Sequence, residues 1–296
     1  MTLARAAAVT DTGRRRRRNE DAYVCDPPLF VIADGMGGAQ AGEIASHIAA
    51  TSAQHAERNG PTDEQGVVQL IQDANRSVYE RARADESTSG MGTTMTVALV
   101  EDGGVVFGHV GDSRAYVLRD GELEQLTDDH SLVAELVRGG KLSAEEAEHH
   151  PQRSVITRAL GTDPDVDVDT FTVEGREGDV FVLCSDGLTD MVADEEIGEV
   201  PAERRESLEE AANELVRRAN RAGGQDNITV VAFALTDEPD ERTLEQTVEQ
   251  TVEQTAVQDA TEAPKPKGEG HRFLPLIILI AAIVVAAAIL WVLVKR

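Results

Sequence analysis

The chain has 296 residues, of which 41% are hydrophobic, and this is enough for a real core and excludes a globally disordered protein. Its 28 Lys and Arg residues against 54 Asp and Glu residues give a formal net charge of −26, which argues against non-specific binding to nucleic acid. Lysine is scarce beside the plentiful carboxylates, a balance that suits either a halophilic source or an ordinary acidic protein from a GC-rich genome.

Residues 1–235 alternate short apolar runs with amphipathic segments, as expected of one globular domain. Strands are predicted at 29–33, 93–100, 105–110, 115–118, 180–184 and 228–235, and helices at 41–58, 64–84, 132–137 and 208–222. The tight Asp- and Gly-rich connections at 101–104 and 119–122 favour antiparallel hairpins. Antiparallel strands with separate helices predict an α+β sandwich rather than a Rossmann-like sheet.

The composition changes at residue 236. Residues 236–273 are rich in Glu, Gln, Thr, Asp and Pro, which predicts a flexible acidic linker, with a phosphorylatable or docking segment as the alternative. Residues 274–294 are apolar apart from Pro275, and about 31 Å of helix would cross a bilayer core. We therefore predict one C-terminal transmembrane helix with a basic tail at 295–296; a buried core helix is the alternative.

The orientation in the membrane is predicted mainly from the N-terminus. Residues 1–9 are too short an apolar region for a signal peptide, while basic residues flank both ends of the predicted span and favour one orientation only modestly. Two cysteines are too few for a disulfide framework and suit a reducing compartment. We expect a single-pass protein of the inner cell membrane whose large domain is cytoplasmic.

Acidic residues recur beside Gly or Asn at the ends of the predicted strands. The segments are 19–21, 33–38, 111–114, 185–187 and 226–227. A strand that ends in Asp-Gly brings a carboxylate to the rim of the core and lets a backbone carbonyl approach closely, as hard cations require. Each Asp-Gly taken singly is more simply a turn. Several converging carboxylates would repel one another without metal ions, so together they predict a metal site.

Taken in chain order, these motifs closely resemble the metal-dependent protein phosphatases of type 2C, in their compact bacterial form. The resemblance covers about residues 4–235. Its motifs are Gly13-x-x-Arg16-x-x-Asn19-Glu20-Asp21, Asp34-Gly35-Met36-Gly37-Gly38, Gly92-Thr93-Thr94, Gly111-Asp112-Ser113-Arg114, Ile156-Thr157-Arg158-Ala159-Leu160-Gly161, Ser185-Asp186-Gly187 and Asp226-Asn227. It implies a four-layer α-β-β-α sandwich with two central antiparallel sheets and a metal site at one end.

The resemblance also implies the ligands of two Mn²⁺ or Mg²⁺ ions. Asp34, Asp186 and Asp226 would hold the first ion. Asp34 and the backbone oxygen of Gly35 would hold the second, so that Asp34 bridges the pair. Asp112, with Asp186, would hold a third and weaker ion.

Further residues are given supporting roles by the same resemblance. Glu20 and Asp21 would support the second ion through bound waters, or Asp21 as an outer carboxylate, and Asn227 would orient the Asp before it. Arg16 would bind the equatorial phosphate oxygens with its planar guanidinium. It lies within five consecutive arginines at 14–18, for which a solvated basic face is the alternative.

The expected chemistry is hydrolysis by a metal-bridged water. Two divalent cations lower the pKa of that water, so that hydroxide attacks phosphorus in line without a phospho-enzyme. Met36 stands where many eukaryotic relatives place a histidine, so the proton donor to the leaving alcohol is unassigned. His109, inside a predicted strand, is expected to be structural. The Glu- and His-rich segment 139–158, here termed the flap, matches the family's substrate-contacting segment or is an ordinary surface loop.

The predicted function is therefore hydrolysis of phosphoserine and phosphothreonine in proteins, reversing a Ser/Thr kinase at the membrane. Two alternatives stay open. One is a non-catalytic, membrane-tethered signalling module, against which the retention of every main carboxylate argues. The other is a phosphatase for small-molecule phosphates, because a metal centre recognises mainly the phosphoryl group.

Overall fold

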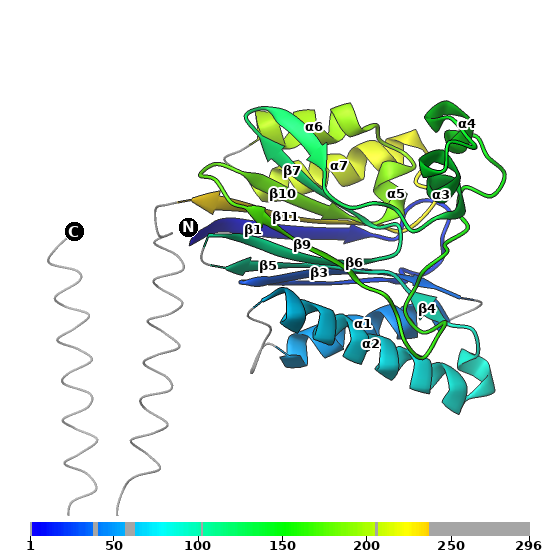
Figure 1. Cartoon of the computed structure of the whole chain (residues 1–296). Helices are drawn as coiled ribbons and strands as arrows, with labels where there is room; N and C mark the ends of the chain where they lie inside the picture. The colour runs from blue at the N-terminus through cyan, green and yellow to red at the C-terminus, as the bar shows by residue number, and fades with distance from the viewer. Residues whose placement is uncertain (1, 38–40, 57–62, 102, 205–206, 237–296) are drawn as a thin grey trace, which may run out of the picture. The chain divides into compact units, whose positions relative to one another are not determined.

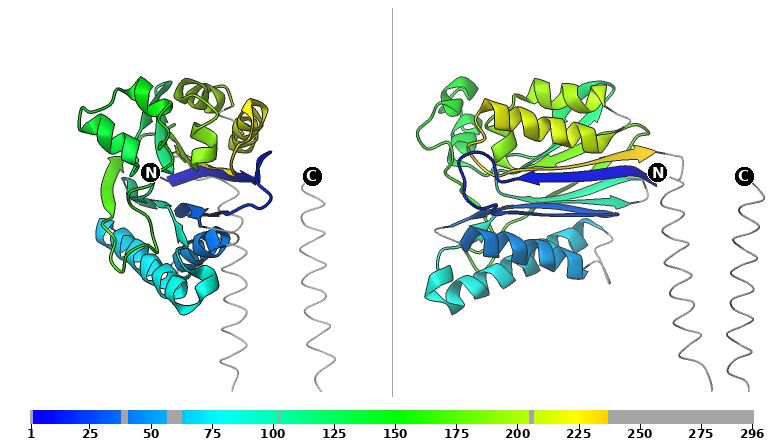
Figure 2. Two further views of the ribbon diagram at one scale, coloured as in Figure 1. Left: turned by 90° about the vertical axis from the view of Figure 1, so that its right-hand side faces the viewer. Right: turned by 180° about the vertical axis from the view of Figure 1, so that it is seen from behind.

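The computed structural model describes residues 2–37, 41–56, 63–101, 103–204 and 207–236. Two antiparallel sheets lie face to face, and helices cover the outer face of each (Figure 1). The same four layers are visible from two other sides in Figure 2. This arrangement confirms the predicted α+β sandwich with two central antiparallel sheets.

The first sheet has five strands in the order β1-β11-β10-β7-β8. They are β1 (Thr2–Asp11), β7 (Arg114–Arg119), β8 (Glu122–Gln125), β10 (Val180–Cys184) and β11 (Ile228–Thr236). The helices on its outer face are α5 (Asp186–Thr189), α6 (Asp194–Glu203) and α7 (Leu208–Ala222).

The second sheet has six strands, in the order β2-β3-β5-β6-β9 with β4 paired to β3. They are β2 (Asp21–Asp26), β3 (Leu29–Met36), β4 (Gly92–Thr93), β5 (Met95–Glu101), β6 (Gly104–Val110) and β9 (Asp169–Glu174). Its outer face is covered by α1 (Ala41–Ala56) and α2 (Glu64–Ala84). Two short helices, α3 (Leu132–Arg138) and α4 (Ala144–Glu148), lie in the segment that joins the two sheets.

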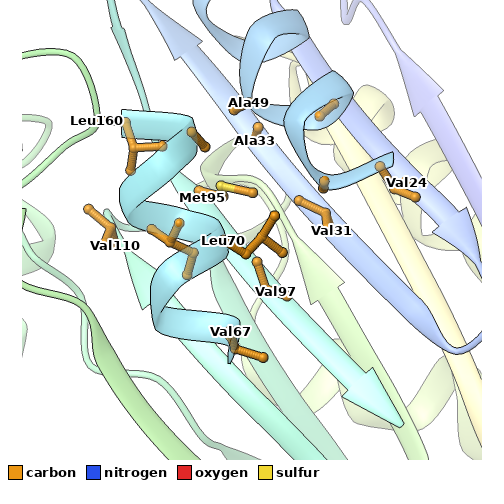
Figure 3. Close-up of a cluster of buried hydrophobic side chains, with 14 of the residues drawn as sticks. Val24, Val31, Ala33, Ala49, Val67, Leu70, Met95, Val97, Val110 and Leu160 are labelled. Atoms are coloured by element: carbon orange, nitrogen blue, oxygen red, sulfur yellow. The ribbon is translucent and has the colours of Figure 1, made fainter. Parts of the chain in front are cut away.

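The central strands are apolar along their whole length because both of their faces are buried. In β3, Phe30 and Ile32 point between the sheets, while Val31 and Ala33 pack against the helices. Phe30 stacks on Phe233 of the opposite sheet with 4.2 Å between the ring centroids. Figure 3 shows the helix side of the same sheet, where Val31 and Ala33 lie beneath α1 and α2. Burial on two faces explains why these strands show no alternation of polar and apolar residues.

The predicted strands form, although the one predicted at 93–100 is divided at Thr94 into β4 and β5, and the predicted hairpins form as well. Between β7 and β8 the two turn residues Asp120 and Gly121 have φ values of 53° and 88°, as a two-residue hairpin turn requires. Strands β1, β2, β8 and β9 were not predicted, nor were helices α4, α5 and α6.

The predicted C-terminal segments lie outside the described part of the chain. This holds for the linker beyond Thr236, for the transmembrane helix at 274–294 and for the tail at 295–296. In the part of the chain that the structure describes, no helix has the length and apolar character needed to cross a membrane.

Candidate active site

The five acidic motifs of the sequence meet at one end of the sandwich. Strand β3 passes through Asp34 at its end, β6 leads into Asp112, and β10 leads into Asp186. Strand β11 begins just after Asp226, and β2 begins at Asp21, which pairs with Asp34 in register. Because neighbouring strands run antiparallel, the ends of some strands meet the starts of others at this edge. The predicted convergence of the carboxylates is confirmed.

A cavity of about 390 Å³ opens at this end of the domain. The predicted site residues on its walls are Arg16, Glu20, Asp34, Gly35, Asp112, Asp186 and Asp226. Met36 also lines the cavity, so the position that holds histidine in some relatives does face the site. Asp21 and Asn227 lie behind the walls, at 6% and 3% exposure.

The carboxyl groups in this cavity have raised pKa values because they are buried together. Burial, followed by the charges of Asp21 and Asp186, raises the pKa of Asp34 well above its ordinary value. Burial and the charges of Asp112 and Asp226 do the same to Asp186. For Asp112 the pKa rises to about 7, with burial as the first cause. The metal-free chain therefore cannot keep all of these groups ionised at neutral pH without strong repulsion.

The residues fit divalent cations of the hard, oxygen-seeking kind. Buried oxygens without a hydrogen-bond partner in the described part of the chain include Oδ1 of Asp21, of Asp112 and of Asp186. A buried carboxylate oxygen without a partner is costly, and an ion would satisfy it. The donors are all oxygens, as Mg²⁺ and Mn²⁺ prefer. Within the described ranges, no three or more His, Cys, Asp or Glu side chains already form a group suited to hold an ion.

Arg16 is engaged with one of the predicted metal ligands. Its Nη2 donates to Oδ2 of Asp226 at 2.6 Å, and its Nη1 lies 3.8 Å from Glu20. The guanidinium therefore balances negative charge on the cavity wall. Its predicted role in phosphate binding stays a prediction, and that role requires it to exchange the Asp226 carboxylate for a phosphate oxygen.

Asp21 joins the two sheets behind the cavity. Its Oδ2 accepts hydrogen bonds from Ser185 Oγ at 2.9 Å and from Thr229 Oγ1 at 2.6 Å. Thr229 lies in β11 of the other sheet, and Ser185 directly follows β10 of that sheet. Burial is the first cause that raises its pKa, to about 6. This position agrees with an outer carboxylate rather than with one that faces the cavity.

Asn227 holds the arginine-rich loop in place. Its Oδ1 accepts from the backbone N–H of Glu20 at 2.8 Å, and its Nδ2 donates to the carbonyls of Thr12 at 3.0 Å and Arg18 at 2.8 Å. Its backbone N–H, and not its side chain, donates to Oδ1 of Asp226 at 2.8 Å. The predicted orientation of Asp226 is thus carried by the main chain, while the side chain fixes the loop that presents Arg16.

The threonines of the Gly-Thr-Thr motif clamp the backbone beside Asp34. Thr94 Oγ1 accepts from the N–H of Asp34 at 2.9 Å, and Thr93 Oγ1 donates to its carbonyl at 2.8 Å. Thr94 Oγ1 is also 2.9 Å from Ser113 Oγ in the next motif. Short polar side chains at these positions therefore hold the carboxylates of Asp34 and Asp112 in a fixed relation.

Two motif glycines are required by close backbone approaches. A Cβ on Gly35 would lie 2.2 Å from the carbonyl oxygen of Gly42, and a Cβ on Gly187 would lie 1.9 Å from that of Asn227. Both distances are far below a van der Waals contact. The glycine after each aspartate thus lets a second chain segment pass directly behind the site.

The cavity contains residues that the sequence did not single out. Asp190 lies four residues after Asp186, as the C-cap of the short helix that Asp186 begins, and the i, i+4 spacing was the available signal. Arg153 and Ser154 of the flap also line the cavity, and Arg153 Nη2 lies 3.5 Å from Asp190 Oδ2. This placement favours a site-contacting flap over an ordinary surface loop.

The structure defines a two-sheet α+β domain with a carboxylate-lined cavity at one end, and comparison with known proteins identifies the family. Residues 14–231 match the family model described as protein phosphatase 2C. The chain therefore belongs to the protein phosphatase 2C family, in its bacterial form, and is an enzyme of the protein phosphatase class, as its motifs predicted.

Relatives of known name cover most of the domain. Serine/threonine phosphatase stp of Listeria monocytogenes is 40% identical over 233 residues, which is 75% of this chain and 92% of the relative. Serine/threonine protein phosphatase PstP of Mycobacterium tuberculosis is 40% identical over 237 residues, 79% of this chain and 46% of that protein.

Solved structures agree with the fold. The crystal structure of the M. tuberculosis phosphatase PstP/Ppp has a TM-score of 0.75 at 39% identity and covers 79% of this chain and 100% of that one. The catalytic domain of PstP in complex with two manganese ions has a TM-score of 0.74 at 37% identity and covers 79% of this chain and 99% of that one.

Proposed function

We propose that this chain hydrolyses phosphoserine and phosphothreonine in proteins, in a reaction that depends on divalent metal ions. The observation that carries the proposal is the meeting of Asp34, Asp112, Asp186 and Asp226 in one cavity whose wall also presents Arg16. The relatives named serine/threonine phosphatases support the substrate class.

Two Mn²⁺ or Mg²⁺ ions would be held by residues of this cavity. Asp34, Asp186 and Asp226 are the proposed ligands of one ion, and Asp34 with the carbonyl of Gly35 those of the other; Asp112 would support a third. The manganese ions in the structure of a relative's catalytic domain support this choice. When bound, the ions would activate a water molecule for attack on phosphorus and offset the charge of the phosphoryl group.

The chain's own side chains bind and orient the phosphate. Arg16 can donate two parallel hydrogen bonds from its guanidinium, so it is the proposed partner of the equatorial phosphate oxygens once it leaves Asp226. Met36 on the wall has no proton to give, and no histidine lines the cavity in the described part of the chain. We therefore expect water to protonate the leaving alcohol.

The test is phosphate release from a phosphothreonine peptide by the full-length chain in detergent. We expect activity with Mn²⁺, no activity in a chelator, and a loss of at least about a hundredfold in Asp34→Asn. Asp26→Asn, at the exposed far end of β2, is the matched control and should keep full activity. Activity that survives chelation, or that Asp34→Asn retains, would contradict the metal mechanism. A higher kcat/KM for p-nitrophenyl phosphate than for the peptide would instead favour the small-molecule alternative.

We also propose that the enzyme is held at the inner cell membrane and acts on nearby phosphoproteins, among them a Ser/Thr kinase. The support is the apolar composition of residues 274–294 in the sequence. Deleting residues 274–296 should move the protein from the membrane fraction to the soluble fraction without changing its activity on a peptide. A truncated protein that still sediments with membranes would refute the anchor.

A further inference from the structure

His130 is a buried histidine that joins two walls of the cavity, and the mechanism above makes no use of it. It is 3% exposed and lies between β8 and α3. Its backbone N–H donates to the carbonyl of Gly111 at 2.8 Å, and its Nδ1 accepts from the N–H of Gly111 at 3.0 Å. His130 therefore bonds both the N–H and the carbonyl of Gly111, the residue immediately before Asp112.

The hydrogen bond from Gly111 decides where the ring proton lies. Because Nδ1 is an acceptor, a neutral ring carries its proton on Nε2. Nε2 lies 3.1 Å from Oδ2 of Asp169, which can only accept, and 3.0 Å from Nη1 of Arg158, which can only donate. Because Nε2 carries the proton, its hydrogen-bond partner is Asp169 and not Arg158. Arg158 Nη1 donates to Oδ1 of the same carboxylate. Asp169 thus accepts from two donors, His130 and Arg158, the last residue of the flap.

The main chain of His130 holds the flap as well. Its carbonyl accepts from the N–H of Thr157 at 2.8 Å, and the next residue, Ser131, pairs with Ile156 as an isolated β-bridge. Ile156 lines the cavity. One residue therefore links the cavity wall made by the flap with the wall that presents Asp112.

The imidazole ring of His130 cannot turn freely because a second histidine lies against it. The ring centroids of His109 and His130 are 4.8 Å apart. His109 is fixed by Thr96 Oγ1 at 2.9 Å and by the carbonyl of Asp128 at 3.2 Å. Burial lowers the pKa of His109 to about 4, so this ring is neutral, and its predicted structural role is confirmed.

We propose that His130 is a positioning residue for the phosphatase reaction: through Nδ1 it fixes the turn before Asp112, and through Nε2 and Asp169 it fixes the flap. The inference rests on the proposed function. The two hydrogen bonds of the His130 ring should therefore have different consequences. Loss of the Gly111 bond should disturb metal binding at Asp112, and loss of the Asp169 bond should disturb peptide binding by the flap.

Two substitutions separate the roles of these two hydrogen bonds. His130→Asn places a carboxamide oxygen near the position of Nδ1, so it keeps an acceptor for Gly111 and loses the bond to Asp169. His130→Gln places an amide NH₂ near the position of Nε2, so it keeps the donor to Asp169 and leaves the buried N–H of Gly111 without a partner. Asp169→Asn weakens the bond between His130 and Asp169 without changing a core residue, because the Asp169 side chain is 45% exposed.

The first measurement is Mn²⁺ affinity by calorimetry, which does not require activity. We expect about tenfold weaker binding in His130→Gln and a change of less than about twofold in His130→Asn and Asp169→Asn, since one buried hydrogen bond lost corresponds to about a tenfold effect. The second is KM for a phosphothreonine peptide at saturating Mn²⁺. It should rise about tenfold in His130→Asn and Asp169→Asn and less than about twofold in His130→Gln.

The exposed His55→Asn on α1 is the matched control and should change neither quantity. Variants that lose thermal stability alike while Mn²⁺ affinity and KM stay at wild-type values would overturn the proposal. So would His130→Asn and His130→Gln that shift both quantities equally. A wild-type chain that binds Mn²⁺ but releases no phosphate would count against the proposed function alone, and the calorimetric arm would still decide the role of His130 toward Asp112.

Discussion

Replacing Asp21 with asparagine should make the metal-free domain more stable at high pH and leave its stability almost unchanged at low pH. Asp21 is 6% exposed. Its pKa rises to about 6 because burial outweighs the hydrogen bonds from Thr229 and Ser185. An asparagine has the same shape, offers an oxygen to both hydroxyls and carries no charge. The substitution therefore removes the buried charge and little else.

The sign follows from proton binding. The pKa of Asp21 in the folded chain, about 6, lies above the ordinary value of 3.8, so the folded state holds the proton more tightly than the unfolded chain does. The stability that this provides is complete below about pH 3.8 and is lost as the pH rises through about 6. Each pH unit in this interval is about 1.4 kcal/mol, so the loss approaches about 3 kcal/mol at pH 8. For a domain of this size that lowers the Tm by about 6–12 °C.

The assay is thermal unfolding in a chelator at pH 4, 6 and 8, for the wild type and Asp21→Asn side by side. The difference in unfolding free energy should grow from under about 1 kcal/mol at pH 4 to about 3 kcal/mol at pH 8. Asp26→Asn, on the exposed end of the same strand, should show no such trend. A difference between wild type and Asp21→Asn that does not change with pH would refute the reasoning from buried charge.

Three further substitutions test the site. Gly187→Ala should lower the Tm strongly or prevent folding, because its Cβ would lie 1.9 Å from the carbonyl oxygen of Asn227; a wild-type Tm would contradict this. Asn227→Ala removes three side-chain hydrogen bonds and should cost about 2–3 kcal/mol in urea unfolding. Arg16→Lys keeps the charge but loses the planar fork, so KM for a phosphopeptide should rise about tenfold with unchanged Tm; an unchanged KM would remove Arg16 from phosphate binding.

The sequence predicts best the elements whose evidence is local. Strands β10 and β11 are uninterrupted apolar runs bounded by turn residues, and both were placed within one residue of their ends. Strand β1 was missed because four of its ten residues are alanine, which is uncommon in strands. It is held in the sheet by pairing with β11, over two hundred residues away in the chain, and no local pattern carries that information.

The candidate site likewise contains features with local sequence signals and features without them. The carboxylates were predicted because each stands beside a glycine or asparagine at the end of an apolar strand, which is a local signal. The contacts that fix them were not predicted. Asp21 accepts from Ser185 beside the other sheet, Arg16 pairs with Asp226, and His130 bonds to Gly111. These pairs meet only after the two sheets have packed, so neither composition nor spacing indicates them.

The raised pKa values and the rigid backbone together explain why this site should bind cations tightly. Thr93 and Thr94 clamp the main chain at Asp34, and Gly35 leaves no room for the chain behind it to shift. The carboxylates therefore cannot relieve their repulsion by moving apart, and the metal-free chain must bind protons or lose stability as the pH rises. A divalent ion that enters the cavity replaces those protons. Its binding should consequently raise the Tm more at pH 8 than at pH 5, because at pH 5 the ion has to displace protons that the folded chain holds firmly.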